Sequence, residues 1–162
     1  MSENFEGIIA EYGPLVTRIA SSYEADPALQ QDLVQQILLA VWQALPRYRG
    51  DASLKTFIAR IAQNRSISHV AKRAREPASA EIPEIASSQP TPEHEVNQAT
   101  ERRLLMAAMR SLTPPQREVI VLVLEDFTIT EISEMLDIPQ NAVSLRLSRA
   151  KSALKALLEP KQ

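Results

Sequence analysis

The chain has 162 residues, enough for one ordinary domain or two small ones, and 44% of them are hydrophobic. It contains no cysteine, which excludes disulfides, thiol chemistry and cysteine-ligated zinc. Its two histidines, His69 and His94, are too far apart in the sequence to predict a metal site. The longest apolar run, 37–42, is far shorter than the ~20 residues of a membrane-spanning helix, and the acidic start of the chain does not resemble a signal peptide. We therefore expect a cytoplasmic protein with no membrane insertion.

The formal net charge of −2 hides two basic blocks that an acidic block separates. Residues 47–75 carry eight Lys or Arg against one Asp, and residues 138–162 carry five against one Glu. Between them, residues 76–101 carry six Glu and no basic residue. Basic residues clustered on a helix are typical of surfaces that bind phosphates. Charge alone leaves two interpretations open, nucleic-acid binding and two solvated helix faces.

Helix-forming residues dominate, and no long stretch alternates with the period of a strand, so the sequence predicts an all-α protein. In the first part of the chain, Pro14 predicts the start of a second helix. Asp26 is a predicted N-cap, and the helix after it should run to Leu45 and stop at Pro46. Ser53 is the predicted N-cap of the next helix.

Residues 76–92 contain four prolines among Ala, Ser and Glu. Each proline blocks a helix at its own position and disfavours one at the residue before it. The sequence therefore predicts a flexible linker over 76–92. This linker would separate an N-terminal domain, 1–75, from a C-terminal domain, 93–162.

The C-terminal domain should open with a helix near 94–111. Thr113 and Thr128 each begin a predicted capping box and therefore a helix. The helix after Thr113 should bury Val119, Ile120, Val123 and Leu124. A turn at 137–139 leads into a last helix, whose apolar stripe consists of Val143, Leu147, Ala150, Leu154 and Leu157.

A short helix, a three-residue turn and a longer helix with a basic outer face form a predicted helix-turn-helix over 128–155. The second helix of such a motif can lie in the major groove of DNA. Leu145 is a large apolar residue outside the core stripe, beside arginines. It can contact a thymine methyl group, or it can cover a neighbouring helix. The outward residues of the predicted helix are Ser144, Leu145, Arg146, Ser148, Arg149, Lys151, Ser152 and Lys155.

The other basic block combines an aromatic residue, a glycine and many bases. Tyr48, Arg49 and Gly50 precede a helix that carries Lys55, Arg60, Asn64, Arg65, Lys72, Arg73 and Arg75. The tyrosine ring can stack on an unpaired nucleotide, arginines can hold phosphates and Asn64 can read a base edge. Alternatively, Tyr48 is a half-buried ring and Asn64 a packing or capping amide.

The helix over 28–45 is apolar nearly all round. Such a helix is either central in the core or half covered by a partner. Its narrow polar strip contains Asp32, Gln35, Gln36 and Gln43, with Leu39 inside it.

Together these segments resemble the extracytoplasmic-function sigma factors, group 4 of the sigma-70 family of RNA polymerase factors. That family has two helical domains joined by a linker. The resemblance covers nearly the whole chain outside the linker, and it depends on segments in a fixed order: 32–42, 47–64, 112–120, 130–139 and 143–151.

The resemblance implies a role for each surface and implies promoter DNA, RNA polymerase core and an anti-sigma factor as partners. Docking on the β′ clamp of the polymerase is implied for Asp32, Gln35, Gln36, Leu39 and Gln43. Binding of the minus-ten promoter element is implied for Tyr48, Arg49, Gly50, Asp51, Lys55, Arg60, Asn64 and Arg65. Binding of the minus-thirty-five element is implied for Ser144, Leu145, Arg146, Ser148, Arg149 and Lys151. The C-terminal domain would also touch the β flap.

Two segments depart from the family pattern. Leu29, Gln30 and Gln31 precede Asp32 where acids are usual, and Gln36 stands where Glu is usual, which predicts weaker electrostatic docking on the polymerase. Ser144 and Leu145 stand where Lys or Arg and then Ser are usual, which predicts the loss of a DNA contact. We expect no cofactor, no metal, no small-molecule substrate and no enzymatic activity. The alternatives are a stand-alone helix-turn-helix regulator that binds duplex DNA and, less favoured, a helical adaptor.

Overall fold

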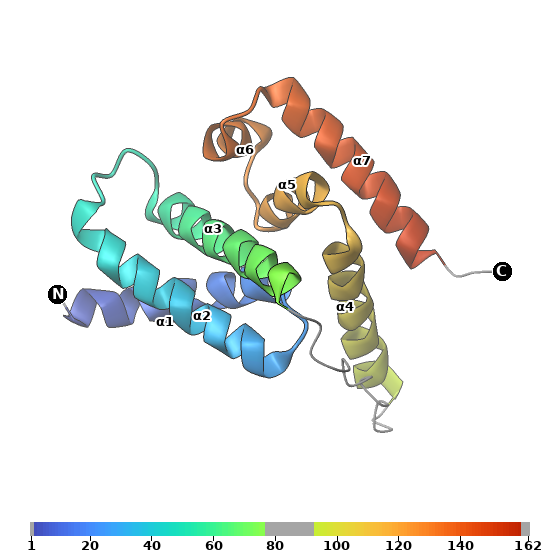
Figure 1. Cartoon of the computed structure of the whole chain (residues 1–162), viewed down its shortest axis with the longest axis horizontal. Helices are drawn as coiled ribbons and strands as arrows, with labels where there is room; N and C mark the ends of the chain where they lie inside the picture. The colour runs from blue at the N-terminus through green and yellow to red at the C-terminus, as the bar shows by residue number, and fades with distance from the viewer. Residues whose placement is uncertain (1, 77–92, 160–162) are drawn as a thin grey trace.

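The computed structural model describes the backbone of residues 2–76 and 93–159, and the side chains of residues 5–76 and 98–159. Within these ranges every regular element is a helix, as the sequence predicts. The helices form an N-terminal group and a C-terminal group that face each other (Figure 1). The predicted linker, 76–92, lies outside the described residues except for Glu76. None of the described helices is both long enough and apolar enough to cross a membrane.

The N-terminal group consists of α1 (Ser2–Ser21), α2 (Pro27–Ala44), a short 3-10 helix (Leu45–Arg47) and α3 (Leu54–Arg75). Two of the predicted caps are confirmed. Asp26 accepts a hydrogen bond from the backbone N–H of Ala28 at 2.9 Å, and Ser53 accepts one from that of Thr56 at 3.1 Å. The three helices pack on one another around a core of fully buried side chains that includes Val16, Ile19, Leu33, Ile37, Val41 and Ile58.

The predicted start of a new helix at Pro14 is wrong, because α1 continues through it. Pro14 is exposed, and a proline in a helix removes one backbone hydrogen bond. The apolar residues on its two sides belong to one stripe at helical spacing, and burial of that stripe keeps the helix continuous. The stripe consists of Phe5, Ile8, Tyr12, Leu15 and Ile19.

The C-terminal group consists of α4 (Glu93–Ser111), α5 (Pro114–Leu124), α6 (Ile129–Leu136) and α7 (Gln140–Leu158). The capping box at Thr128 is confirmed, because its hydroxyl and the Glu131 carboxylate each accept the other residue's backbone N–H. The capping box at Thr113 is wrong, because its side chain makes no cap bond. A capping side chain uses the N–H of the second or third helical residue, and Pro115 at the second position of α5 has none.

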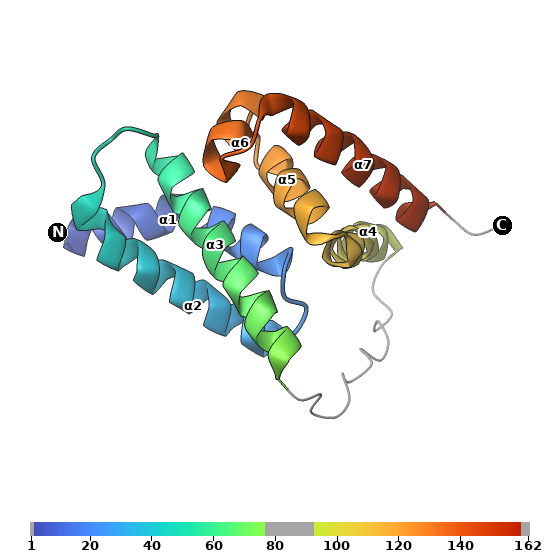
Figure 2. The same cartoon turned by 45° about the horizontal axis from the view of Figure 1, so that its top comes forward.

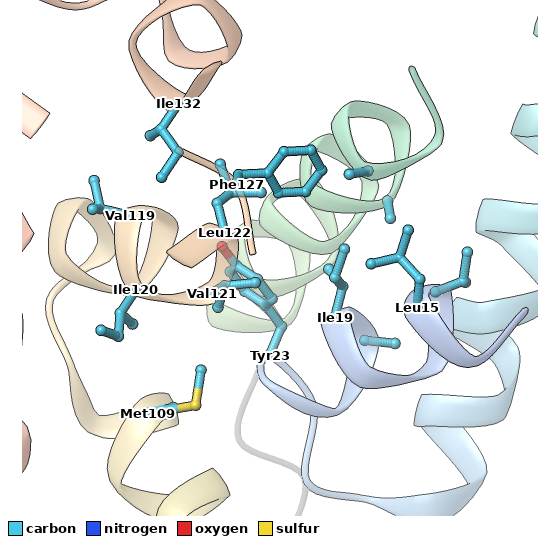
Figure 3. Close-up of a cluster of buried hydrophobic side chains, with 14 of the residues drawn as sticks. Leu15, Ile19, Tyr23, Met109, Val119, Ile120, Val121, Leu122, Phe127 and Ile132 are labelled. Atoms are coloured by element: carbon cyan, nitrogen blue, oxygen red, sulfur yellow. The ribbon is translucent and has the colours of Figure 1, made fainter. Parts of the chain in front are cut away.

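Helix α5 is buried more completely than its sequence pattern predicts. Val119, Ile120, Val121 and Leu122 are all at most 3% exposed, whereas the predicted core residue Leu124 is 48% exposed. Tyr23, at the end of α1, places its ring beside Val121 (Figure 3). The N-terminal group therefore covers a face of α5 that the sequence pattern leaves unassigned. Leu157, the last residue of the predicted stripe on α7, is also exposed.

Candidate nucleic-acid interfaces

The turn between α6 and α7 is fixed by local bonds. Asp137 ends α6 in the left-handed conformation, with φ 55° and ψ 49°, which an aspartate tolerates better than most residues. The Ser133 hydroxyl donates to the carbonyl of Ile138, and the Gln140 amide donates to the Thr130 hydroxyl at 3.3 Å. Because of this turn the two helices do not run parallel (Figure 2). This is the geometry of a helix-turn-helix.

Five of the six predicted base-facing or phosphate-facing residues of α7 are exposed. They are Ser144, Leu145, Ser148, Arg149 and Lys151. Leu145 is 51% exposed, which argues against its covering a neighbouring helix. An exposed leucine among basic residues is instead available to a thymine methyl group.

Arg146 is the sixth residue, and it is only half exposed. Burial raises the pKa of Glu118 on α5, and the positive charges of Arg146 and Arg117 oppose that rise. Arg146 thus lies in the electric field of the Glu118 carboxylate, which belongs to the same C-terminal group of helices. Part of its charge is compensated before any phosphate is bound.

The start of α7 carries two exposed amides that the predicted DNA-binding residues, which begin at Ser144, do not include. Gln140 and Asn141 occupy the first two positions of the helix and are exposed. The first residues of such a helix are the ones that reach base edges, and amide side chains pair with adenine. Their position directly after the turn was the signal that could have found them.

The loop before α3 holds Tyr48 in place. Its hydroxyl donates to the carbonyl of Ala52 at 2.6 Å, and its ring centroid lies 4.9 Å from that of Phe57. Tyr48 is half-buried, whereas Arg49, Gly50 and Asp51 are exposed. Gly50 has a φ of 83°, a conformation that favours glycine. The loop therefore presents a braced aromatic ring beside an exposed arginine.

Helix α3 turns its predicted DNA-binding residues in two directions. Arg60, Asn64 and Arg65 are exposed. Lys55 instead points to the C-terminal group, where its ammonium donates to the carbonyl of Glu125 at 2.6 Å and lies 4.8 Å from the ring centroid of Phe127. The structure thus separates Lys55 from the other residues of the predicted minus-ten surface.

Helix α2 exposes all five residues of the predicted polymerase-docking surface, and four of them line two hollows. Asp32 and Gln36 line a cleft of about 590 Å³ together with cationic residues of α3. Gln35 and Leu39 line a shallower groove of about 260 Å³ with Trp42 and apolar residues of α1. Gln43 is exposed near the end of α2. Leu39 and Trp42 are each 54% exposed, so this helix is not purely a core helix.

Among the described residues, no group of three His, Cys, Asp or Glu side chains could hold a metal ion. The histidine that lies among them, His69, is engaged elsewhere. Its Nε2 donates to the carboxylate of Glu24 at 2.7 Å.

Two family models match successive segments of the chain. The family model for sigma-70 region 2 matches residues 8–76, and the model for sigma-70 region 4 matches residues 102–154. The RNA polymerase sigma factor NccH of Alcaligenes xylosoxydans xylosoxydans is 27% identical over 98% of this chain and 88% of its own length. The ECF RNA polymerase sigma-E factor of Escherichia coli K12 is 25% identical over 96% of this chain and 87% of its own length.

Two solved structures share the fold. CnrH, in complex with the cytosolic domain of CnrY, matches 98% of this chain and 89% of its own with a TM-score of 0.69 and 24% identity. The sigma factor RpoE of Bartonella quintana, in complex with the anti-sigma factor NepR, matches 99% of both chains with a TM-score of 0.73 and 21% identity. With both family regions present in order and relatives matched over almost the entire chain, the protein belongs to the extracytoplasmic-function sigma factors.

Proposed function

We propose that this protein brings RNA polymerase core to specific promoters by dividing the task among three exposed surfaces. Helix α2 docks on the β′ clamp, the loop before α3 and the outer face of α3 bind the minus-ten element, and α7 binds the minus-thirty-five element. The C-terminal group also touches the β flap. The polymerase performs the bond chemistry, so the protein itself is not an enzyme and needs no cofactor, metal or small-molecule substrate. It acts in the cytoplasm.

The main support for this proposal is the exposed outer face of α7, which follows a turn that is fixed by side-chain hydrogen bonds. Ser144, Leu145, Ser148 and Arg149 are free of the core, and only such residues can reach base edges in a major groove. The exposed Asn64 and the braced Tyr48 ring support a second contact, with unpaired nucleotides of the minus-ten element.

A stand-alone helix-turn-helix regulator explains α6 and α7 but leaves the N-terminal surfaces without a purpose. Leu39 and Trp42 expose apolar area on α2, which a protein in water retains at a cost unless a partner covers it. Polymerase core is the partner that we propose for this surface.

We also propose that an anti-sigma factor controls the protein. In two solved structures a protein of this fold is bound to a second protein: CnrH to the cytosolic domain of CnrY, and the sigma factor RpoE to the anti-sigma factor NepR. Deleting such a partner in the source cell should raise transcription from the promoters that this protein recognises.

The direct test combines the purified protein with polymerase core and a promoter library in vitro. Initiation at a defined sequence with minus-ten and minus-thirty-five elements is the expected result. Duplex binding without core, and no initiation with it, would favour the regulator. Arg149→Ala should weaken initiation at these promoters, and Lys155→Ala, an exposed basic residue further along α7, is its matched control.

A further inference from the structure

The first residue of α7, Gln140, is held by a side chain of the helix before it. Gln140 is exposed, and its side-chain Nε2 donates to the hydroxyl oxygen of Thr130 at 3.3 Å. Thr130 is the second residue of α6 and is also exposed. The bond therefore joins the starts of the two helices of the helix-turn-helix, which lies at one edge of the molecule (Figure 1).

The position of Thr130 is fixed by the chain around it. The capping box between Thr128 and Glu131 sets the first turn of α6, and the Ser133 hydroxyl donates to a backbone carbonyl on the far side of the turn. Neither interaction uses the Thr130 hydroxyl, which therefore remains available as an acceptor. An exposed hydrogen bond of this kind adds little to stability. Its consequence is orientation, because an amide that is already held loses less conformational freedom when it binds a partner.

The bond to Thr130 decides which groups of the Gln140 amide remain for DNA. A glutamine amide has one oxygen that accepts hydrogen bonds and two N–H groups that donate them. Because Thr130 takes one N–H, Gln140 keeps one acceptor and one donor. In the major groove adenine presents the complementary pair, a donor at N6 and an acceptor at N7, whereas guanine presents two acceptors. The held amide therefore matches adenine, and its oxygen would face the O6 acceptor of guanine.

We propose that Gln140 is a specificity-determining residue that binds the N6 and N7 edge of one adenine in the minus-thirty-five element. Thr130 is the positioning residue that holds the amide for this contact. The first residues of the second helix of such a motif are those that reach base edges, and Gln140 is the first residue of α7. This inference rests on the proposed function, because it takes α7 to lie in the major groove of that element.

The test measures base preference at each position of the element with the full chain and polymerase core. A promoter library is randomised over the minus-thirty-five element, and the DNA that the holoenzyme binds is sequenced. The variants are Gln140→Ala, Gln140→Glu, Thr130→Val and Thr130→Ser. Asn141→Ala is the matched control, because Asn141 is an exposed amide at the second position of α7 but lies about 100° further round the helix.

The parent should prefer adenine at one position by about tenfold, and Gln140→Ala should lose this preference there and nowhere else. Gln140→Glu has only acceptors and should prefer cytosine at the same position, because a glutamate accepts from the N4 amino group of cytosine. Thr130→Val, which has no hydroxyl, should reduce the preference for adenine over guanine. Thr130→Ser retains a hydroxyl and should keep that preference, as should Asn141→Ala.

A modified base tests the contact at one atom. 7-Deazaadenine has a C–H group where adenine has N7, so it lacks that acceptor. At the position identified by the library it should lower the affinity of the parent holoenzyme about fivefold and leave that of the Gln140→Ala holoenzyme unchanged. A disturbed fold would change affinity at every position and would not depend on N7, so this comparison separates base reading from a structural effect.

The adenine contact is overturned if the parent shows no adenine preference that depends on Gln140, or if the parent and Gln140→Ala lose equally with 7-deazaadenine. Equal preferences in Thr130→Val and Thr130→Ser overturn the positioning role. If the parent initiates at defined promoters and no base preference depends on Gln140, the proposed function stands and this inference fails. If DNA binding shows the expected dependence but the holoenzyme initiates nowhere, the inference stands and the proposed function fails.

Discussion

The Glu24 carboxylate, at the end of α1, accepts two bonds from Nη1 of Arg73 on α3, at 2.6 Å to Oε1 and 2.7 Å to Oε2. The Glu24 side chain is 3% exposed and that of Arg73 is 45% exposed. His69 and the backbone N–H of Asp26 also donate to this carboxylate. A buried charge with three donors ties the chain before α2 to the last turns of α3.

Glu24→Gln should lower the free energy of unfolding by about 2 kcal/mol, because the charge-assisted bonds are lost while the donors remain. Thermal unfolding should show a melting temperature lower by roughly 5 °C. Glu11→Gln, at an exposed position of α1, is the control and should change little. An unchanged melting temperature for Glu24→Gln would show that the charge-assisted bonds of this carboxylate add nothing to stability.

The same carboxylate should make stability depend on pH. Burial by itself raises the pKa of Glu24, but the Asp26 N–H, His69 and Arg73 outweigh it and hold this pKa below its usual value of 4.5. A carboxyl with a lowered pKa in the folded state stabilises the fold fully above its unfolded pKa, and this stabilisation is lost as the pH falls through the folded pKa. Urea unfolding should therefore show the parent and Glu24→Gln converging in stability below pH 4.5.

Leu145→Ala should alter base preference without altering stability, because the side chain is 51% exposed. Thymines of the minus-thirty-five element can be replaced one at a time by uracil, which lacks the methyl group. With holoenzyme, the affinity of the parent should fall about fourfold at one position, the value of one buried methyl group. The affinity of the Leu145→Ala variant should not change when the thymine at that position is replaced by uracil. Equal losses for the parent and the variant would exclude the methyl contact.

Leu39→Ser should weaken binding to polymerase core by about tenfold, since half of an apolar side chain would no longer be buried against the partner. Leu104→Ser is a matched control, because Leu104 on α4 is also 54% exposed. Titration of labelled protein with core gives both affinities. A similar loss in the two variants would point to a general effect on solubility or fold.

Gln31→Glu and Gln36→Glu should each tighten core binding by a factor of about two to five, the usual value of one exposed ion pair. Both residues are exposed on α2. The gain should be smaller for Gln36→Glu, because Gln36 shares its cleft with Arg65 and Lys72, which would partly neutralise a new carboxylate. Raising the salt concentration should remove both gains. No gain in either variant would refute an electrostatic deficit in this surface.

Much of the fold follows from local chemistry that is visible in the sequence. Asp26, Ser53 and Thr128 begin their helices as predicted, because a cap depends only on residues a few positions away. The helix-turn-helix follows for the same reason, and seven of its eight predicted outward residues are exposed. The roles of the individual surface residues stay predictions.

Only the tertiary structure decided which helix faces meet across the two groups. Val121 is buried and Lys55 is turned toward Glu125 because each contacts residues far away in the sequence. The periodicity of a sequence shows which face of a helix is apolar. It does not show which residues become buried where the N-terminal and C-terminal groups meet. By itself the sequence determined most of the helices, three of their N-caps and the family. The contact between the modules depended on long-range packing, which no short window of residues encodes.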